Sequence, residues 1–384
     1  MAKIYLEHLH KNYGESVALN DLTLHIEDKE LIVFLGPSGC GKTTSLNCIA
    51  GIEQPTSGRI HFDGQDVTDV PPHRRNIAMV FQSALLYPHL TARDNIRISL
   101  RISRISKQDI DRQVEEAAKL LDIHGLLDKL PFHMSGGERQ RVATAKAIVR
   151  NPSVFLMDEP LASLDAAMRE DLRAEIVVLQ KKLGTTMVFV THDQVEAMTM
   201  GDRIAIMQAG ALQQVGTSDE IYSSPVNTFV AGFVGSPPMN FFQGAIEKRD
   251  EEHRFKHTKF HVKLPEAVVQ RSEEPLEAKS VTLGVRPHHM TLSETPEEGA
   301  LKGQIYAVER LGKETVVIVQ YGGEVKFKAI VPPSFRQSMG DVVYVLPQAE
   351  HIYLFDSNTG RNLLCQKKQA SASPARSSLS DLNG

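Results

Sequence analysis

The sequence has no tryptophan, only three cysteines and no long apolar run. Cys40, Cys48 and Cys365 are too few and too far apart for a disulfide framework or a Cys-x-x-Cys metal site, so a reducing cytosol is the expected compartment. The first residues are polar where a signal peptide would have its apolar stretch, and no later stretch approaches the ~18 residues of a membrane-spanning helix. The sequence therefore predicts a chain that is neither secreted nor inserted into a membrane by itself.

The sequence also lacks an excess of charge of either sign. Its 43 Lys and Arg residues against 47 Asp and Glu residues leave a net charge of −4, with 41% hydrophobic and 23% charged residues. These values are near the averages of soluble globular proteins and indicate no general attraction to nucleic acid. At about 150 residues per domain, the 384 residues predict two or three domains.

Two sequence patterns divide the chain. In residues 1–235, short β-branched runs alternate with helical patterns, which is typical of a sheet of parallel strands covered by helices. The expected strands there are 31–35, 77–81, 154–158, 187–191 and 204–207, and an amphipathic helix is expected over 107–122. Residues 236–365 predict a small all-β barrel or sandwich, with strands expected at 260–264, 281–285, 304–308, 315–321, 325–330, 342–346 and 352–355. The tail 366–384 is predicted to be disordered.

A glycine-rich loop lies between the first of these strands and a helical pattern at 44–50. Its residues are Gly36, Pro37, Ser38, Gly39, Cys40, Gly41, Lys42 and Thr43, with Thr44 following. This spacing is that of a phosphate-binding loop: backbone amides and the helix N-terminus attract phosphate, Lys42 reaches the β and γ oxygens, and the Thr43 hydroxyl ligates Mg²⁺. The same helix N-terminus and Lys42 predict a lowered pKa and high reactivity for the Cys40 thiol. The alternative interpretation of the whole loop is an ordinary glycine-rich turn between a strand and a helix.

A second motif is the apolar strand 154–158, which ends in the carboxylates Asp158 and Glu159. A plain strand end is the simplest interpretation. After a phosphate loop, the same motif resembles a Walker B strand, which implies that Asp158 holds Mg²⁺ through water. Glu159 is then the general base that orients and deprotonates the attacking water.

A third motif starts a predicted helix. Ser135 and Glu138 have the spacing of a capping box, which on its own describes a well-capped helix, and Gly136 and Gly137 lie between them. A helix N-terminus with two glycines and a serine hydroxyl is also suited to a γ-phosphate. The set of motifs resembles the ATP-binding cassette family, whose signature loop reads Leu-Ser-Gly-Gly-Gln; here Met134 and Glu138 replace the first and last residues.

This resemblance implies a fold and further site residues. The fold is an α/β ATP-binding cassette, a P-loop NTPase with a helical signature subdomain at about 85–150, followed by an all-β, OB-like domain of the TOBE type. Tyr13 matches the aromatic residue that stacks on adenine, although a core tyrosine at a strand edge is an equal alternative. Gln82 matches the residue that senses Mg²⁺ and the attacking water. Asp165 matches the D-loop, and His192 matches the histidine that contacts the γ-phosphate, although a lone histidine at a strand end is more often structural.

The resemblance also implies partners. In this family the signature acts in trans, so ATP lies between the phosphate loop of one chain and Ser135 to Gly137 of another, in a homodimer or a pair of cassettes. The apolar segment 84–91 either packs on its own subdomain or receives a helix of a membrane subunit. The implied assembly contains two integral membrane permease subunits and an extracytoplasmic solute-binding protein, with this chain peripheral on the cytoplasmic face of the membrane and no nucleic acid.

The C-terminal region narrows the resemblance. Segments 235–241, 284–289 and 354–356 resemble the maltose-transporter ATPase group, which implies ATP-driven import of a sugar, oligosaccharide, polyol or glycerol phosphate. An importer of polyamines, iron or inorganic anions is the alternative within the family. A soluble cassette ATPase of DNA repair or translation is the alternative of another class, but the sequence has one cassette and no zinc cysteines or long coiled coil. A non-hydrolysing regulatory protein is disfavoured by Lys42, Asp158, Glu159 and His192.

Overall fold

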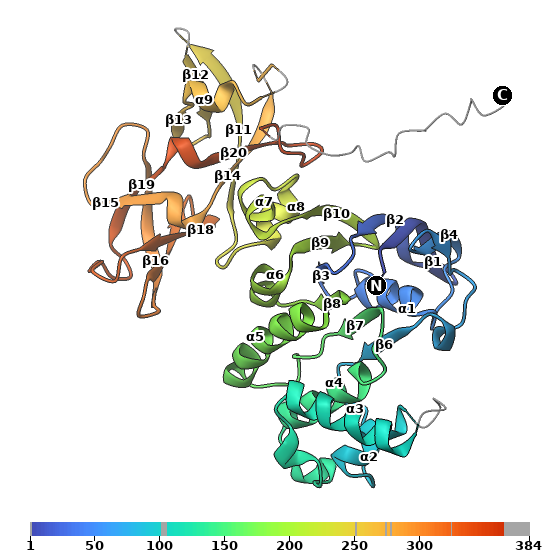
Figure 1. Cartoon of the computed structure of the whole chain (residues 1–384). Helices are drawn as coiled ribbons and strands as arrows, with labels where there is room; N and C mark the ends of the chain where they lie inside the picture. Colours follow the sequence, from blue (N-terminus) through green and yellow to red (C-terminus); the bar gives the residue numbers. More distant parts are fainter. Residues whose placement is uncertain are drawn as a thin grey trace, which may run out of the picture. The chain divides into compact units, whose positions relative to one another are not determined.

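The computed structural model describes residues 2–100, 106–249, 252–272, 275–276, 279–323 and 325–364. The chain forms two compact units that divide between Ser223 and Ser224 (Figure 1). The boundary at residue 235 remains a prediction, and both Cys365 and the tail 366–384 lie outside the described residues.

The first unit is built on a six-stranded sheet in the order β10-β9-β3-β8-β7-β6. Its strands are β3 Leu31–Leu35, β6 Ile77–Val80, β7 Val154–Asp158, β8 Thr186–Thr191, β9 Arg203–Gln208 and β10 Ala211–Gly216. Only β10 is antiparallel to its neighbour. Helices cover both faces of such a sheet, so its strands are buried and read as continuous apolar runs. All five strands predicted for this region are present.

A second, antiparallel sheet in the order β2-β1-β4-β5 faces helix α1. Its strands are β1 Ile4–Tyr13, β2 Ser16–Ile26, β4 Ser57–Phe62 and β5 Gln65–Asp66, and α1 spans Lys42–Ala50. Leu46 and Ile49 of α1 belong to one buried core with Leu6 of β1 and Phe34 of β3. The helix that follows the phosphate loop is therefore packed between two sheets, which fixes the position of its N-terminus.

The described part of the first unit contains six further α-helices. They are α2 Ala92–Ile98, α3 Lys107–Leu120, α4 Gly136–Ile148, α5 Ala166–Leu183, α6 Gln194–Met200 and α7 Ser218–Ser223, with short 3-10 turns η1 Pro72–Arg74, η2 His124–Leu126 and η3 Pro131–His133. Helices α2, α3 and α4 contact one another and gather at one end of the unit, beyond β6 (Figure 1). The predicted amphipathic helix is present as α3, which buries Val114, Ala117 and Ala118. Among the described residues, no helix has the length and apolar character needed to span a membrane.

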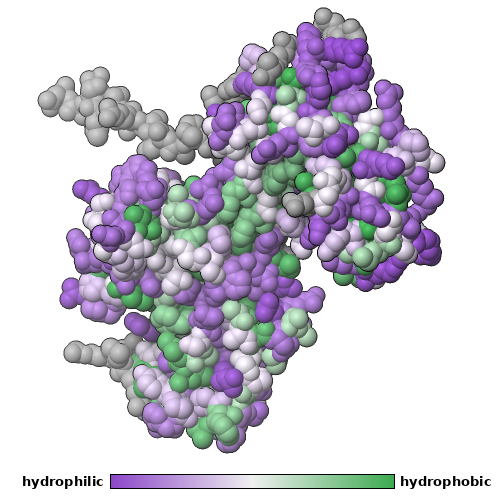
Figure 2. All heavy atoms as spheres, turned by 180° about the vertical axis from the view of Figure 1, so that it is seen from behind, coloured by the Kyte–Doolittle hydropathy of each residue, from purple (hydrophilic) through white to green (hydrophobic). Residues whose placement is uncertain are grey.

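The second unit consists of two antiparallel five-stranded sheets, β13-β12-β11-β14-β20 and β15-β19-β16-β17-β18. Its elements are α8 Thr228–Phe233, β11 Asn240–Arg249, β12 Glu252–Lys256, β13 His261–Lys263, α9 Glu266–Val269, β14 Ser280–Val285, η4 Pro287–His289, β15 Met290–Ser293, β16 Leu301–Arg310, β17 Thr315–Tyr321, β18 Val325–Val331, β19 Val342–Pro347, η5 Ala349–His351 and β20 Ile352–Asp356. All seven predicted strands are present. Both sheets contribute to one core, for example through Leu283 and Val317. On the face shown in Figure 2, hydrophobic and hydrophilic residues are intermixed.

Candidate active site

The predicted phosphate loop, carboxylates and histidine lie at the carboxyl ends of neighbouring parallel strands. Asp158 ends β7 and pairs with Val190 of β8, two residues before His192. Leu35, directly before the phosphate loop, pairs with Thr191 of β8. Because parallel strands end at the same edge of a sheet, and ligands of such folds bind at that edge, the structure collects the phosphate loop, the carboxylates and the histidine in one place.

The phosphate loop needs glycine at two positions. A Cβ atom on Gly36 would lie 2.4 Å from the Met207 carbonyl oxygen. Gly41 has φ of +102° as the N-cap of α1, and a Cβ atom there would lie 2.5 Å from the Ala18 carbonyl oxygen. Within the described chain no side chain caps α1, so its first amides are open to an anion.

Lys42 lies inside this loop. Its Nζ donates to the carbonyl oxygens of Gly36 at 2.7 Å and Pro37 at 3.1 Å, and the residue is 4% exposed. A buried ammonium group paired with neutral carbonyls is complementary to an anionic ligand. The contact predicted between Lys42 and phosphate requires the side chain to exchange these carbonyls for phosphate oxygens.

The predicted lowering of the Cys40 pKa is wrong. The residue is 3% exposed, and burial raises the pKa of its thiol although Lys42 Nζ lies 3.9 Å from Sγ. Burial disfavours the thiolate more than the neighbouring cation favours it. The sequence showed the cation and the helix N-terminus but not the packing around the sulfur atom.

Thr43 and Asp158 meet where α1 begins and β7 ends. The Thr43 hydroxyl donates to Asp158 Oδ1 at 3.0 Å. Burial, with the charge of neighbouring Glu159, raises the pKa of Asp158. A hydroxyl and a carboxylate in contact are the oxygen donors that Mg²⁺ takes beside nucleotide phosphates, so these residues fit that ion. Gln82 is exposed just after β6, and no hydrogen bond within the described chain joins it to either residue.

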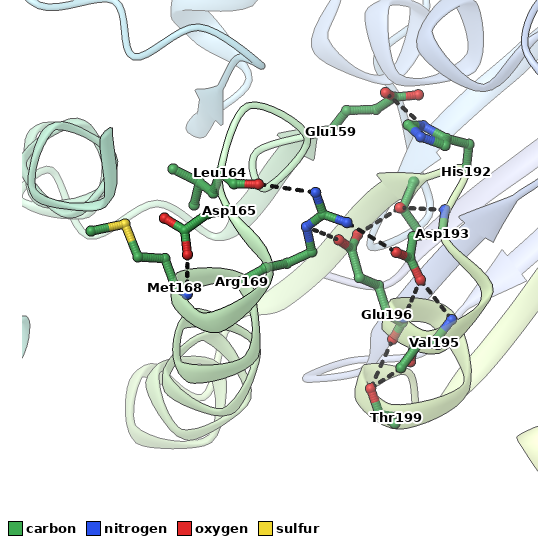
Figure 3. A network of polar contacts seen from close by, with 11 residues as sticks. Glu159, Leu164, Asp165, Met168, Arg169, His192, Asp193, Val195, Glu196 and Thr199 are labelled. Carbon is green, nitrogen blue, oxygen red and sulfur yellow. Dashed lines mark hydrogen bonds and ion pairs between the residues drawn. The ribbon is translucent and has the colours of Figure 1, made fainter. Parts of the chain in front are cut away.

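Glu159 and His192 are brought into direct contact (Figure 3). Glu159 Oε2 lies 2.9 Å from His192 Nδ1, and the His192 side chain is 54% exposed. The backbone of Glu159 has φ of +46°, a conformation that is uncommon for residues other than glycine and that clusters at functional sites. Its amide donates to the Val190 carbonyl at 3.0 Å, which holds the carboxylate of the predicted general base beside β8.

The signature segment forms the predicted capping box at the start of α4. Ser135 Oγ accepts from the Glu138 amide at 3.1 Å, and Glu138 Oε2 accepts from the Ser135 amide at 2.6 Å. These bonds and nearby Lys129 hold the pKa of Glu138 below its usual value. Gly136 and Gly137 are the first two residues of α4. Among the described residues, no hydrogen bond joins these groups to the phosphate loop of the same chain.

Tyr13 and Asp165 occupy the ends of two other elements. Tyr13 ends β1, is 47% exposed, and has Lys11 Nζ at 4.9 Å from its ring centroid. This exposure excludes the alternative of a core tyrosine. Asp165 is the N-cap of α5, where Oδ1 accepts from the Met168 amide at 3.0 Å.

Two polar residues with a clear structural role carried no sequence signal. Asn95 is fully buried, and its amide group binds the backbone of Tyr87, Leu90 and Thr91. Arg169 of α5 contacts groups from two separate loops (Figure 3). Of these contacts, the one between Arg169 and Asp193 joins residues 24 positions apart, which no local sequence pattern predicts.

Comparisons with known proteins identify relatives of the chain. The family described as ABC transporter matches residues 19–162. The trehalose/maltose import ATP-binding protein MalK of Thermococcus litoralis is 44% identical over 373 residues, which cover 94% of this chain and 99% of that protein. The chain belongs to the ABC transporter family as an ATP-binding subunit. This ABC ATPase also matches the MalK OB fold domain over residues 235–290 and the TOBE domain over 283–355.

A second relative and two solved structures extend the comparison. The maltose/maltodextrin import ATP-binding protein MalK of Vibrio cholerae is 42% identical over 365 residues, covering 93% of the ABC ATPase and 95% of that protein. A dimeric ATP-binding cassette in a post-hydrolysis state, bound to ADP and Pi, has a TM-score of 0.51 at 31% identity. The match covers 56% of this chain and 98% of the solved chain. The cbiO1 protein of Clostridium perfringens, part of an ABC transporter complex, has a TM-score of 0.54 at 29% identity. That match covers 57% of this chain and 89% of the cbiO1 chain.

Proposed function

We propose that this ABC ATPase energises the import of a sugar or a related solute by hydrolysing ATP between two head-to-tail cassettes. The observation that carries the proposal is the sheet edge where the Glu159–His192 contact lies beside Thr43 and Asp158. The relatives named as import proteins for trehalose, maltose and maltodextrin match both compact units and not only the cassette, which supports a sugar or related solute as the cargo.

The roles of this chain's residues follow from their positions. The open amides at the start of α1 and the Lys42 ammonium bind the phosphates, and Tyr13 offers its exposed ring to the adenine. Thr43 and Asp158, with Gln82, would hold Mg²⁺, which neutralises charge on the phosphate oxygens. Glu159 accepts the proton of the attacking water at its carboxylate, while His192 Nδ1 holds that carboxylate in place.

A second cassette completes the proposed site. Ser135, Gly136 and Gly137 at the start of α4 would bind the γ-phosphate of the ATP held by the partner cassette. The Glu138 carboxylate already accepts a hydrogen bond from the Ser135 amide. Asp165 would lie at the same dimer contact. The solved dimeric cassette bound to ADP and Pi supports this arrangement.

Features of the segment 84–91 support the proposal that the chain binds membrane proteins. Asn95 holds its backbone, so the segment does pack on its own subdomain. Even so, the side chains of Leu85 and Tyr87 are 56% and 44% exposed. An exposed aliphatic and aromatic pair on a fixed backbone suits an apolar helix of a partner. We infer that one permease subunit docks here on each of the two cassettes, that the chain is peripheral on the cytoplasmic face, and that an extracytoplasmic binding protein delivers the solute.

Affinity capture tests this assembly. Tagged protein is purified from detergent-solubilised membranes, and multi-spanning proteins are expected in the eluate by mass spectrometry. Leu85→Asp should lose them, whereas Val178→Asp, which adds the same charge at a 50% exposed position on α5, should retain them. Recovery of only soluble nucleic-acid-binding or ribosomal proteins would refute the import function.

Uptake of labelled solutes tests the cargo. Cells that lack this chain should lose uptake of radiolabelled maltose or trehalose and regain it with the wild-type chain but not with Glu159→Gln. Restored uptake of a polyamine, iron or an inorganic anion instead would keep the importer and overturn the sugar assignment.

A further inference from the structure

Arg169 connects two loops of the candidate site. It lies on α5, one turn after the D-loop residue Asp165. Its Nη2 donates to the Leu164 carbonyl oxygen at 3.0 Å, and its Nη1 donates to Asp193 Oδ2 at 3.3 Å. Its Nε lies 3.8 Å from Glu196 Oε1. One guanidinium group therefore faces the end of the D-loop on one side and two carboxylates of the His192 segment on the other (Figure 3).

The two carboxylates belong to a small, closed network. Glu196 is 3% exposed, and its Oε2 accepts from the Thr191 hydroxyl at 2.6 Å. The Thr191 hydroxyl in turn accepts from the Asp193 amide at 2.9 Å. Asp193 Oδ1 accepts from the Val195 amide at 2.7 Å, which caps α6. Through these bonds the backbone on both sides of His192 is tied to Arg169.

The loop from Glu159 to Asp165 is consequently held to the His192 segment at both ends. At its start, Glu159 contacts His192 directly at 2.9 Å. At its end, the Leu164 carbonyl reaches Asp193 through Arg169. A planar group with fixed donors can hydrogen-bond two acceptors and face a third carboxylate at the same time, which a lysine ammonium on a flexible stem cannot reproduce.

We propose that Arg169 is a positioning residue that fixes His192 and Glu159 relative to the D-loop, so that dimer contacts made by the D-loop set the alignment of the predicted base. This inference rests on the catalytic roles proposed above. It assigns Arg169 a function in hydrolysis although the residue does not touch the reacting atoms.

The test compares Arg169→Met and Arg169→Lys with Lys181→Met. Lys181 is a matched control because it also lies on α5 and also pairs with a carboxylate, that of Asp202, but in an exposed ion pair. Hydrogen exchange of residues 191–196 should be faster in Arg169→Met than in the wild type and unchanged in Lys181→Met. Turnover should fall about 10- to 100-fold, as expected for a misplaced catalytic group, with the KM for ATP unchanged. The turnover of Arg169→Lys should be closer to that of Arg169→Met than to that of the wild type.

A double-mutant cycle separates positioning from a general loss of stability. In single-turnover assays with radiolabelled ATP, Arg169→Met should have less than about a twofold effect when His192 is already replaced by alanine, because coupled residues are not additive. Unchanged exchange of residues 191–196, or an equal effect of Arg169→Met in both backgrounds, would overturn the inference. If cells that lack this chain still take up maltose and trehalose while the Arg169 results hold, only the sugar-import proposal is refuted.

Discussion

In the first unit, neighbouring parallel strands end at one edge of the sheet, whereas every strand pairing described in the second unit is antiparallel. Parallel strands place the residues that follow them side by side. Antiparallel strands send successive ends to opposite edges, so polar residues are dispersed. The contrast explains why the phosphate loop, Asp158, Glu159 and His192 converge in the first unit.

In the second unit, a buried arginine and a partly exposed histidine cluster stabilise the fold instead. Arg286 is 1% exposed and donates to the carbonyl oxygens of Ala231 and Val234 at the end of α8. His289 stacks on His351 with ring centroids 3.9 Å apart and lies 4.0 Å from the His288 ring. These groups pair with backbone or with one another, which points to a structural rather than a catalytic use.

The largest expected effect tests the catalytic side of this contrast. Glu159→Gln should lower turnover about 10²- to 10⁴-fold, the usual contribution of a general base, while ATP binding and the midpoint of thermal unfolding stay near wild type. ATPase assays and nucleotide-binding titrations measure both. The control is Glu170→Gln, an exposed glutamate on α5, which should be silent. Wild-type turnover in Glu159→Gln would exclude this residue as the base.

Arg286→Met tests the structural side. It should lower the free energy of unfolding by about 2–3 kcal/mol because two buried carbonyls lose their donor, without changing ATP hydrolysis per folded molecule. Urea unfolding followed by circular dichroism measures the loss. Arg336→Met is the matched control, since Arg336 also donates to a carbonyl, that of Pro333, but at an exposed position. Equal stability of the two variants would contradict the role given to Arg286.

Cys40 tests, within the first unit, whether burial or the Lys42 charge dominates the chemistry of a thiol. Because burial raises the pKa of this thiol, N-ethylmaleimide at neutral pH should modify Cys40 about tenfold or more slowly than a free cysteine peptide. Mass spectrometry of a chain with Cys48 and Cys365 replaced by serine measures the rate. A rate above that of the free peptide would restore the original expectation of a reactive thiol.

The smallest expected effect concerns the histidine cluster. Burial and the nearby charges of His288, His351 and Arg286 lower the pKa of His289 from 6.5 to about 4. The unfolded chain therefore binds the proton first as the pH falls, so stability should decrease between about pH 6.5 and about pH 4. Solvent screening limits the loss to about 1 kcal/mol. Unfolding of the wild type and of His289→Asn across this range checks it, and identical pH dependence of the two would contradict it.

Local and periodic features could be predicted from the sequence alone. Strands 31–35 and 154–158 were predictable because strands buried on both faces are continuous apolar runs. The phosphate loop and the Ser135–Glu138 capping box were predictable because all their partners lie within a few residues. Strand β1 was not, since register shifts between Leu6 and Leu9 interrupt the alternation that marks an amphipathic strand.

Features that depend on distant partners were decided by the tertiary structure. The pKa of Cys40 follows from the packing around its sulfur atom, which outweighs the Lys42 charge two residues away. Arg169 meets Asp193 only because α5 and α6 pack together. Hence the sequence determined which residues form the phosphate loop and carry the carboxylates, since those depend on local spacing. Only the folded chain decided which groups are desolvated and which loops are joined, since burial and long-range hydrogen bonds depend on all elements at once.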